Sequence, residues 1–377
     1  MTQTLSVPQG QFPLKRHPVR PNDQLRAWDA ADEYVLEHLV GDADATIDLR
    51  GSIVIVNDAF GALATALAPF APVLITDSEN GRLAAEGNAN HNSVNLPQLR
   101  SSFESPPEPI DVLVVKIPKS DGELVDLLHR LRPSLHAETI VIGAGMTKRV
   151  HQSTISAFES IIGPTTSSLA RKKARLLFSR VDPDLVPPAN PWPKTWNYGG
   201  LTLTNHAGVF SAERIDPGTE LLITSLPDEM ATGDVVVDLG CGNGLLGLAW
   251  AKRHPNAMVT FADESYRALR SAEHSWEGNF GDRPATFVAV DRLVNAVARD
   301  SVDVVLNNPP FHADRSRSDV IAWDMFIDSF AVLRPGGELF VVGNRHLGYH
   351  AKLKKIFGNS EVVTSTKKFV VLRSWRR

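Results

Sequence analysis

The amino-acid sequence predicts two tandem α/β domains, each built around a mostly parallel β-sheet. One observation is the succession of an apolar strand, a glycine-rich turn and an apolar helix over residues 235–251. This layout lets the backbone approach a cofactor at the carboxyl edge of a parallel sheet. The other observation is that features in the same order occur earlier in the chain, from residue 53 onward. Many matching features in one order indicate a duplicated domain.

The two copies correspond segment by segment. Ile53–Val56 predicts a strand that leads into a turn and a helix, and the strand ending at Asp77 is expected to match the strand ending at Asp263. The apolar run from Ile110 is expected to match the buried strand Val302–Asn307. The matching segments are 53–64 with 235–249, 74–77 with the strand ending at Asp263, 110–119 with 302–311, 131–143 with 333–343, and 172–177 with 367–372.

The first copy lacks the residues with which the second would bind ligands. Its turn keeps one glycine, Gly61, and its third strand leads into Lys116-Ile117-Pro118-Lys119 without an amide. We therefore expect residues 1–181 to form a degenerate domain that recognises or positions a substrate, and residues 196–377 to form the catalytic domain. The proline-dense segment 182–195 between them predicts a semi-rigid linker.

The glycine turn of the second copy predicts a cofactor site. Three of its glycines, Gly242, Gly244 and Gly247, have the spacing G-x-G-x-x-G, so a nicotinamide dinucleotide is one candidate. S-adenosylmethionine is favoured because the carboxylate of Asp238, just before the turn, would attract a methionine ammonium and repel a pyrophosphate. Gly240 completes the turn. The sequence thus predicts one S-adenosylmethionine per chain, in the second domain.

Three further residues extend this site. Asp263 lies at a strand end about 20 residues past the turn, where a carboxylate can accept both ribose hydroxyls. Asp291 lies at the next strand end and is expected to hold the adenine amine. Cys241, inside the turn, is expected to face the cofactor through its backbone and not to act as a nucleophile.

The segment Asn308-Pro309-Pro310-Phe311 follows a predicted strand and suits a planar exocyclic amine. Both proline rings fix φ and offer no N–H, so the segment is rigid. The lone pair of such an amine is delocalised until acceptors hold its two N–H groups, and the Asn308 side-chain oxygen and the Pro309 carbonyl could be those acceptors. Phe311 would stack on the substrate ring. The predicted chemistry is methyl transfer from sulfur to nitrogen, for which alignment and exclusion of water are the main requirements.

Composition limits the other possibilities. The 377 residues are enough for two domains, and no apolar run approaches the length of a membrane span. The single cysteine excludes an internal disulfide framework and a cysteine-built zinc site, the polar start lacks a signal-peptide core, and we expect a cytoplasmic protein without a metal. A net charge of −4 provides no global basic field, so any RNA contact must use local basic patches.

With these motifs in view, the chain resembles the two-domain bacterial ribosomal RNA guanine-N2 methyltransferases, most closely the large-subunit methyltransferase G family. The resemblance covers nearly the whole chain, and Phe311-His312 after the prolines, together with the degenerate first copy, is its most specific part. The segments that carry it are 28–34, 57–63, 172–176, 238–244, 308–312, 344–347 and 352–358.

The resemblance implies a class I methyltransferase fold in each half, which is a Rossmann-like, mostly parallel seven-stranded sheet. It implies transfer of a methyl group from S-adenosylmethionine to N2 of one guanine in 23S ribosomal RNA. Asn308 would lie at both the guanine and the donor, and the segment 206–211 would cover the cofactor. RNA contacts are expected from Phe311 and His312 and from four basic residues, Arg345, His346, Lys172 and Lys173.

A guanine in folded RNA must leave its stack to reach such a site. Because flipping is least costly for an unpaired base, protein-free RNA or an early assembly state is the expected partner. The same chemistry would serve N2-guanine methylation of 16S ribosomal RNA, N6-adenine methylation of nucleic acid or methylation of a glutamine side chain. A nicotinamide oxidoreductase and a non-enzymatic ribosome-assembly factor that binds RNA are the remaining alternatives.

Overall fold

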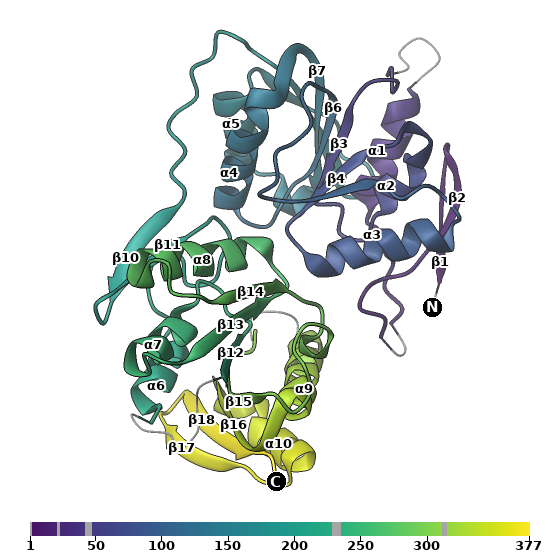
Figure 1. The fold of residues 1–377 in the computed structure, drawn as a ribbon. Helices are drawn as coiled ribbons and strands as arrows, with labels where there is room; N and C mark the ends of the chain where they lie inside the picture. Colours follow the sequence, from purple (N-terminus) through teal and green to yellow (C-terminus); the bar gives the residue numbers. More distant parts are fainter. Residues whose placement is uncertain (1, 21–22, 42–46, 228–234, 311–314) are drawn as a thin grey trace. The chain divides into compact units, whose positions relative to one another are not determined.

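The computed structural model describes residues 2–20, 23–41, 47–227, 235–310 and 315–377. The chain forms two compact units, Met1–Trp192 and Pro193–Arg377 (Figure 1). Within the described residues, each unit contains a seven-stranded sheet and a separate two-stranded hairpin.

The first unit begins with the hairpin β1–β2 and continues as alternating strands and helices. Its strands are β1 (Gln3–Val7), β2 (Gly10–Leu14), β3 (Ile53–Val56), β4 (Val73–Thr76), β5 (Gln98–Ser101), β6 (Ile110–Lys116), β7 (Leu135–Met146), β8 (Thr165–Ser167) and β9 (Ala174–Arg180). Its helices are α1 (Ala30–Val40), α2 (Ala62–Ala66), α3 (Glu79–His91), α4 (Asp121–Leu131) and α5 (Gln152–Ile161).

The second unit repeats this arrangement, with the hairpin β10–β11 before its sheet. Its strands are β10 (Lys194–Tyr198), β11 (Leu201–Asn205), β12 (Val235–Leu239), β13 (Met258–Asp263), β14 (Thr286–Ala289), β15 (Val302–Asn307), β16 (Leu333–Asn344), β17 (Glu361–Ser365) and β18 (Phe369–Trp375). Its helices are α6 (Pro217–Ser225), α7 (Leu245–Arg253), α8 (Tyr266–Phe280), α9 (Arg315–Val332) and α10 (Tyr349–Phe357).

The two large sheets have one topology. Their strand orders are β5-β4-β3-β6-β7-β9-β8 and β14-β13-β12-β15-β16-β18-β17. In both, the first five strands in this order are parallel and the last two pair antiparallel. The predicted fold, two tandem α/β domains with mostly parallel seven-stranded sheets, is confirmed.

Helices cover both faces of each sheet, which is why its central strands are mostly apolar. In the second unit, Val236 and Val304 pack with residues of α7 and α8 on one face. Val237 and Val305 pack with residues of α9 and α10 on the other. Alternate residues of a strand point to opposite faces of the sheet, so the valines of β12 are buried on both faces.

The proline-dense segment after β9 contacts the first unit. Arg132 donates hydrogen bonds to the carbonyl oxygens of Asp182 and Leu185, at 3.0 and 2.7 Å. Asn190 Nδ2 donates to Asp126 Oδ1 at 2.9 Å. The proline segment is therefore held along its length by side chains of the first unit.

Strand registers align the two units residue by residue. Leu239 pairs with Asn307 and Ala262, and in the first unit Val56 pairs with Val115 and Ile75. Leu239 and Val56 are therefore counterparts. Six residues later the following helix begins in each unit, at Leu245 and at Ala62.

This alignment corrects one predicted correspondence. Asp263 is the last residue of β13, and its counterpart is Thr76, the last residue of β4. The expected match of Asp77 with Asp263 is wrong by one position, because β4 ends one residue earlier than the acidic pattern suggested. By the same alignment, Val115 corresponds to Asn307, so the next residue, Lys116, is the counterpart of Asn308.

Candidate active site of the second unit

The glycine turn connects β12 to α7 through residues with positive φ. Gly240, Gly242 and Gly244 have φ of 70°, 55° and 82°, a left-handed region that glycine adopts without steric cost. A Cβ at Gly242 would meet no atom within 4 Å, so the turn is open there. At Gly247 a Cβ would lie 2.4 Å from the Phe261 ring, so this glycine serves close packing of α7 on the sheet.

Asp238 is the fourth residue of β12, and its side chain contacts the start of α7 after the glycine turn. Its side chain is fully buried, and Oδ2 accepts a hydrogen bond from the backbone N–H of Gly247 at 2.9 Å. Oδ1 is buried and has no hydrogen-bond partner among the described residues. Burial raises the pKa of Asp238 to about 8, opposed by the Gly247 N–H and assisted by the charge of Asp263. The carboxyl group is therefore mostly protonated at neutral pH and has one open oxygen.

Asp263 and Asp291 lie at the ends of the neighbouring strands. Asp263 accepts hydrogen bonds from the backbone N–H groups of Gly242 and Ser265, both at 3.0 Å, which brings its carboxylate to the glycine turn. Asp291 follows β14 and accepts from Arg292 N at 2.7 Å and Asn295 Nδ2 at 2.8 Å. Because β12, β13 and β14 are parallel neighbours, the three carboxylates lie along one edge of the sheet.

Asn308 follows β15 at the same edge, one position beyond the pair Leu239–Asn307. Its Nδ2 donates a hydrogen bond to Thr219 Oγ1 of α6 at 2.9 Å. Its Oδ1 is buried and has no partner in the part of the chain that the structure describes. Asn307 Nδ2 donates to Leu239 O at 2.7 Å and thereby ties the end of β15 to the glycine turn. The structure thus places an unused acceptor beside the turn.

The other residues predicted at the glycine turn and after β15 are Cys241 and the segment from Pro309 to His312. Pro309 is buried and Pro310 is exposed, whereas Phe311 and His312 lie outside the described residues. Burial raises the pKa of the Cys241 thiol, as do the nearby charges of Asp263 and Asp238, so the thiol is a poor nucleophile.

The predicted basic residues lie in both units. Arg345 and His346 directly follow β16, at the carboxyl edge shared with Asn308. Lys172 and Lys173 belong to the first unit, where Lys172 forms an ion pair with Glu33 at 2.7 Å. A role of these four residues in RNA binding stays a prediction.

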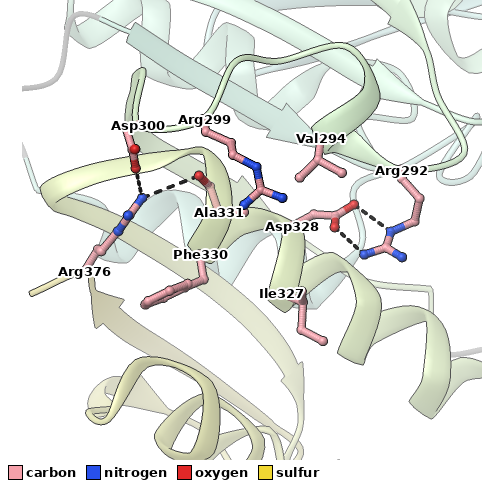
Figure 2. A pocket seen from close by; sticks show the side chains of 9 residues that line it. All are labelled: Arg292, Val294, Arg299, Asp300, Ile327, Asp328, Phe330, Ala331 and Arg376. Carbon is pink, nitrogen blue, oxygen red and sulfur yellow. Dashed lines mark hydrogen bonds and ion pairs between the residues drawn. The ribbon is translucent and has the colours of Figure 1, made fainter.

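A separate cavity of about 260 Å³ lies between the C-terminal part of α9 and the segment 292–300 (Figure 2). Four of its charged residues form two pairs: Arg292 holds the buried carboxylate of Asp328 with two hydrogen bonds, and Arg376 contacts Asp300. None of the predicted site residues lines it. Its arginines tie α9 to the preceding loop and to the C-terminal strand.

Two kinds of feature are absent from the described residues. No group of three or more His, Cys, Asp or Glu side chains there is arranged to hold a metal ion. Nor do these residues include a helix long and apolar enough to cross a membrane.

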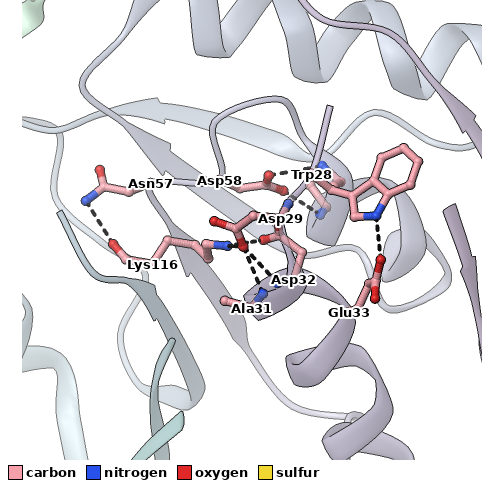
Figure 3. A network of polar contacts seen from close by, with 10 residues as sticks. Trp28, Asp29, Ala31, Asp32, Glu33, Asn57, Asp58 and Lys116 are labelled. Carbon is pink, nitrogen blue, oxygen red and sulfur yellow. Dashed lines mark hydrogen bonds and ion pairs between the residues drawn. The ribbon is translucent and has the colours of Figure 1, made fainter. Parts of the chain in front are cut away.

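The first unit has different residues at each corresponding position. Ile55 and Thr76 are the counterparts of Asp238 and Asp263, and Lys116 is that of Asn308. Lys116 Nζ lies 2.8 Å from Asp29 Oδ1 and 2.5 Å from Asp32 Oδ1 (Figure 3). The side chain of Asp58 accepts hydrogen bonds from the N–H groups of Ala62 and Ala64 at the start of α2. Internal ion pairs and hydrogen bonds thus occupy the polar groups at this edge.

Comparisons with known proteins identify the family. The model for the RLMG N-terminal domain matches residues 2–183, and the model for the methyltransferase small domain matches residues 200–373. A protein of Streptomyces avermitilis named ribosomal RNA large subunit methyltransferase G is 48% identical over 386 aligned residues, covering 100% of both chains. The chain belongs to the ribosomal RNA large subunit methyltransferase G family. A protein of the same name from Aeromonas salmonicida is 42% identical, with 97% of each chain covered.

Among solved structures, a 16S rRNA N2 G1207 methyltransferase of T. thermophilus, in complex with AdoMet and guanosine, has a TM-score of 0.76. It is 21% identical, and the match covers 100% of this chain and 98% of the other. This similarity shows that the chain and that enzyme share a fold. The family predicted from the sequence motifs is confirmed.

Sequence patterns did not single out Thr219 or Asn307. Thr219 lies 89 positions before Asn308, and its contact depends on how α6 packs on the sheet. The one local signal is Asp216, which caps α6 and accepts the N–H of Thr219, and this pattern predicts a helix start without indicating a site.

Proposed function

We propose that the second unit transfers a methyl group from S-adenosylmethionine to the exocyclic N2 of a guanine in 23S ribosomal RNA. The observation that carries this proposal is the buried Oδ1 of Asn308, which has no partner among the described residues and lies at the sheet edge of the glycine turn. A buried acceptor without a partner costs free energy unless a ligand satisfies it. An N–H of the guanine amine is the donor that this oxygen would accept.

The residues at the turn fit S-adenosylmethionine. Asp238 Oδ1 is buried without a partner among the described residues and would accept from the methionine ammonium, and a Cβ at Gly242 would meet no atom within 4 Å. Asp263 lies at the turn through its contact with Gly242 N, and we propose that it also accepts the ribose hydroxyls. When bound, this cofactor supplies a sulfonium methyl group, which is already a strong electrophile. The protein has to hold the amine in line and exclude water, and no side chain needs to act as a nucleophile.

Asn308 would promote the reaction through its amide oxygen. Accepting one N–H of the guanine amine draws electron density toward the nitrogen and opposes delocalisation of the lone pair into the ring. The interaction strengthens as positive charge develops on the nitrogen in the transition state, so it lowers the barrier more than it aids binding. The Pro309 carbonyl is proposed as the second acceptor, and Phe311 and His312 as the contacts to the base.

We assign the two units different roles. The second unit would bind one S-adenosylmethionine, whereas Ile55, Thr76 and Lys116 in the first unit offer neither the carboxylates nor the amide. The first unit would recognise and position RNA, and Lys172 and Lys173 of this unit would contact phosphates together with Arg345 and His346 of the second unit. The proposed partner is protein-free 23S RNA or an early assembly state, because an unpaired guanine costs the least free energy to flip. We propose that the reaction takes place in the cytoplasm.

The proposed substrate is tested by supplying labelled S-adenosylmethionine with protein-free 23S and 16S RNA from a strain that lacks the gene. Nucleoside analysis is expected to find N2-methylguanosine at one position of 23S RNA and none in 16S RNA. Label in 16S RNA would transfer the proposal to the other subunit, and N6-methyladenosine would refute guanine as the base.

Binding of S-adenosylmethionine is expected to release close to one proton at pH 7. In the free protein the pKa of Asp238 is about 8, so the carboxyl is mostly protonated at pH 7. A bound ammonium would lower this pKa and displace the proton. Affinity should therefore increase from pH 6 to pH 7.5, and the calorimetric binding enthalpy should depend on the ionisation enthalpy of the buffer.

The matched variant is Asp238→Asn, which keeps the shape of the side chain but has no titrating proton. Its binding enthalpy at pH 7 should be the same in phosphate and Tris buffers, and its affinity should vary little with pH. A wild-type enthalpy that is also independent of the buffer would rule out proton release from Asp238.

A further inference from the structure

The side-chain amide of Asn308 is held from one side by α6. Its Nδ2 donates a hydrogen bond to Thr219 Oγ1 at 2.9 Å. Thr219 is in the first turn of α6, is 9% exposed, and donates its own backbone N–H to the capping carboxylate of Asp216 at 2.9 Å. The hydroxyl is thus carried by a capped, packed helix start and has little freedom to move.

The direction of this hydrogen bond decides which end of the amide is free. A primary amide has a nitrogen that donates and an oxygen that accepts. With the nitrogen directed to Thr219, the oxygen is left as the open group, and it is the buried atom without a partner among the described residues. A rotation of the amide by half a turn would present N–H groups to the substrate amine, which also donates.

The first unit contains the same contact in another chemical form. Asp32 is the third residue of α1, after the capping residue Asp29, as Thr219 is the third residue of α6, after Asp216. Asp32 contacts Lys116, the counterpart of Asn308, at 2.5 Å. In both units the helix start therefore holds a residue at the carboxyl end of the fourth parallel strand, Lys116 as the last residue of β6 and Asn308 directly after β15, with an ion pair in one and a neutral hydrogen bond in the other.

We infer that Thr219 is a positioning residue, whose hydroxyl anchors the Asn308 side chain at the edge of the sheet in the observed arrangement, with the amide oxygen toward the substrate amine. This inference rests on the proposed function of Asn308 and assigns the device that orients it. Thr219 does not touch the substrate. Its contribution is to hold the amide in place before the guanine binds, so that its loss lowers the rate of methyl transfer and weakens guanosine binding.

The test is Thr219→Val, which preserves the branched shape and removes the acceptor. We expect kcat for methylation of 23S RNA to fall about tenfold, with the KM and Kd for S-adenosylmethionine within twofold of wild type. Thr219→Ser retains the hydroxyl and should restore at least half of kcat. Thr224→Val is the matched control, because Thr224 is on the same helix, is exposed and bonds, within the described residues, to the helix backbone; it should leave kcat unchanged.

Two measurements separate orientation from general damage. In an Asn308→Ala background, Thr219→Val should have no further effect on kcat, because the amide is already absent. In the presence of S-adenosylhomocysteine, Thr219→Val should weaken guanosine binding several-fold, a readout that needs no turnover. Equal kcat for Thr219→Val and wild type, or an additive loss in the Asn308→Ala background, would overturn the inference.

Other outcomes identify which proposal fails. A lower melting temperature together with weaker S-adenosylmethionine binding by Thr219→Val would show a structural role for Thr219 and overturn the positioning role alone. If the wild-type protein methylated no RNA, the proposed function would fail, and the positioning role with it. Active wild-type protein with an equally active Thr219→Val would leave the proposed function intact.

Discussion

Replacing Asn308 by alanine is expected to lower kcat for RNA methylation by two to three orders of magnitude. Alanine removes the buried oxygen that would hold the guanine amine, and deletion of one preorganised hydrogen-bonding group of this kind costs about 10²- to 10³-fold in rate. The cofactor carboxylates Asp238 and Asp263 are untouched. Calorimetry should therefore give an S-adenosylmethionine affinity within about threefold of wild type.

Stability must be checked with the same variant. Asn308→Ala also removes the hydrogen bond to Thr219 Oγ1, a loss of about 1 kcal/mol in the free energy of unfolding. This is too small to unfold the protein, so thermal melting should change by a few degrees at most. Asn256→Ala is the matched control, since Asn256 is exposed in the turn before β13, at the other end of the strands.

One outcome of the Asn308→Ala experiment would contradict the proposed role of the amide oxygen. If Asn308→Ala methylates RNA within about fivefold of the wild-type rate, the amide oxygen is not the acceptor on which the proposed reaction depends. Retained methylation would direct the search to the Pro309 carbonyl. Loss of S-adenosylmethionine binding in the same variant would instead place Asn308 in the cofactor site.

The sequence was sufficient for the fold and for the edge of the sheet where the site lies. Local patterns carried this information: the apolar run of β12, the three glycines with positive φ and the acidic strand ends are each contiguous in the chain. The duplication could be found in the same way, because order along the chain survives the loss of individual residues. The structure confirms this architecture.

Contacts between distant segments could not be predicted. The bond from Asn308 to Thr219 spans 89 positions, and the ion pair of Lys116 with Asp32 spans 84. Periodicity and turn signals describe single elements, whereas these contacts depend on how a helix start packs over a strand end. The correspondence of Asp77 was missed by one position for a related reason, since register is set by strand pairing.

Replacing Lys116 by methionine is expected to destabilise the first unit by about 3–5 kcal/mol, the usual cost of removing one partner of a buried charge pair. The Lys116 ammonium lies against two carboxylates, and its pKa remains above the ordinary lysine value because Asp32 and Asp29 outweigh the effect of burial. Without it, the buried Asp32 loses its counter-charge. Hydrogen exchange in peptides from β3 and β6 should report the loss, with second-unit peptides unchanged.

The matched control is Lys148→Met, which makes the same chemical change at an exposed position of the first unit. Exposed charges contribute little to stability, so its exchange should match wild type within about 0.5 kcal/mol. If Lys116→Met behaved like Lys148→Met, the ion pairs of Lys116 would not stabilise the degenerate edge.

The loss in Lys116→Met should grow with pH. Burial, opposed by Lys116, raises the pKa of Asp32 to about 7, above its value in the unfolded chain. While the folded state binds the extra proton, the free energy of unfolding falls by about 1.4 kcal/mol per pH unit as pH rises. In wild type this fall ends near pH 7, where Asp32 ionises beside Lys116. In Lys116→Met the pKa of Asp32 is higher still, so the fall continues beyond pH 7.

The free energies of unfolding of the two proteins are compared at pH 6 and pH 8.5, with exchange rates normalised to those of unstructured peptides. Their difference should be larger at pH 8.5. An equal or smaller difference at pH 8.5 would exclude Asp32 as the group left without its partner.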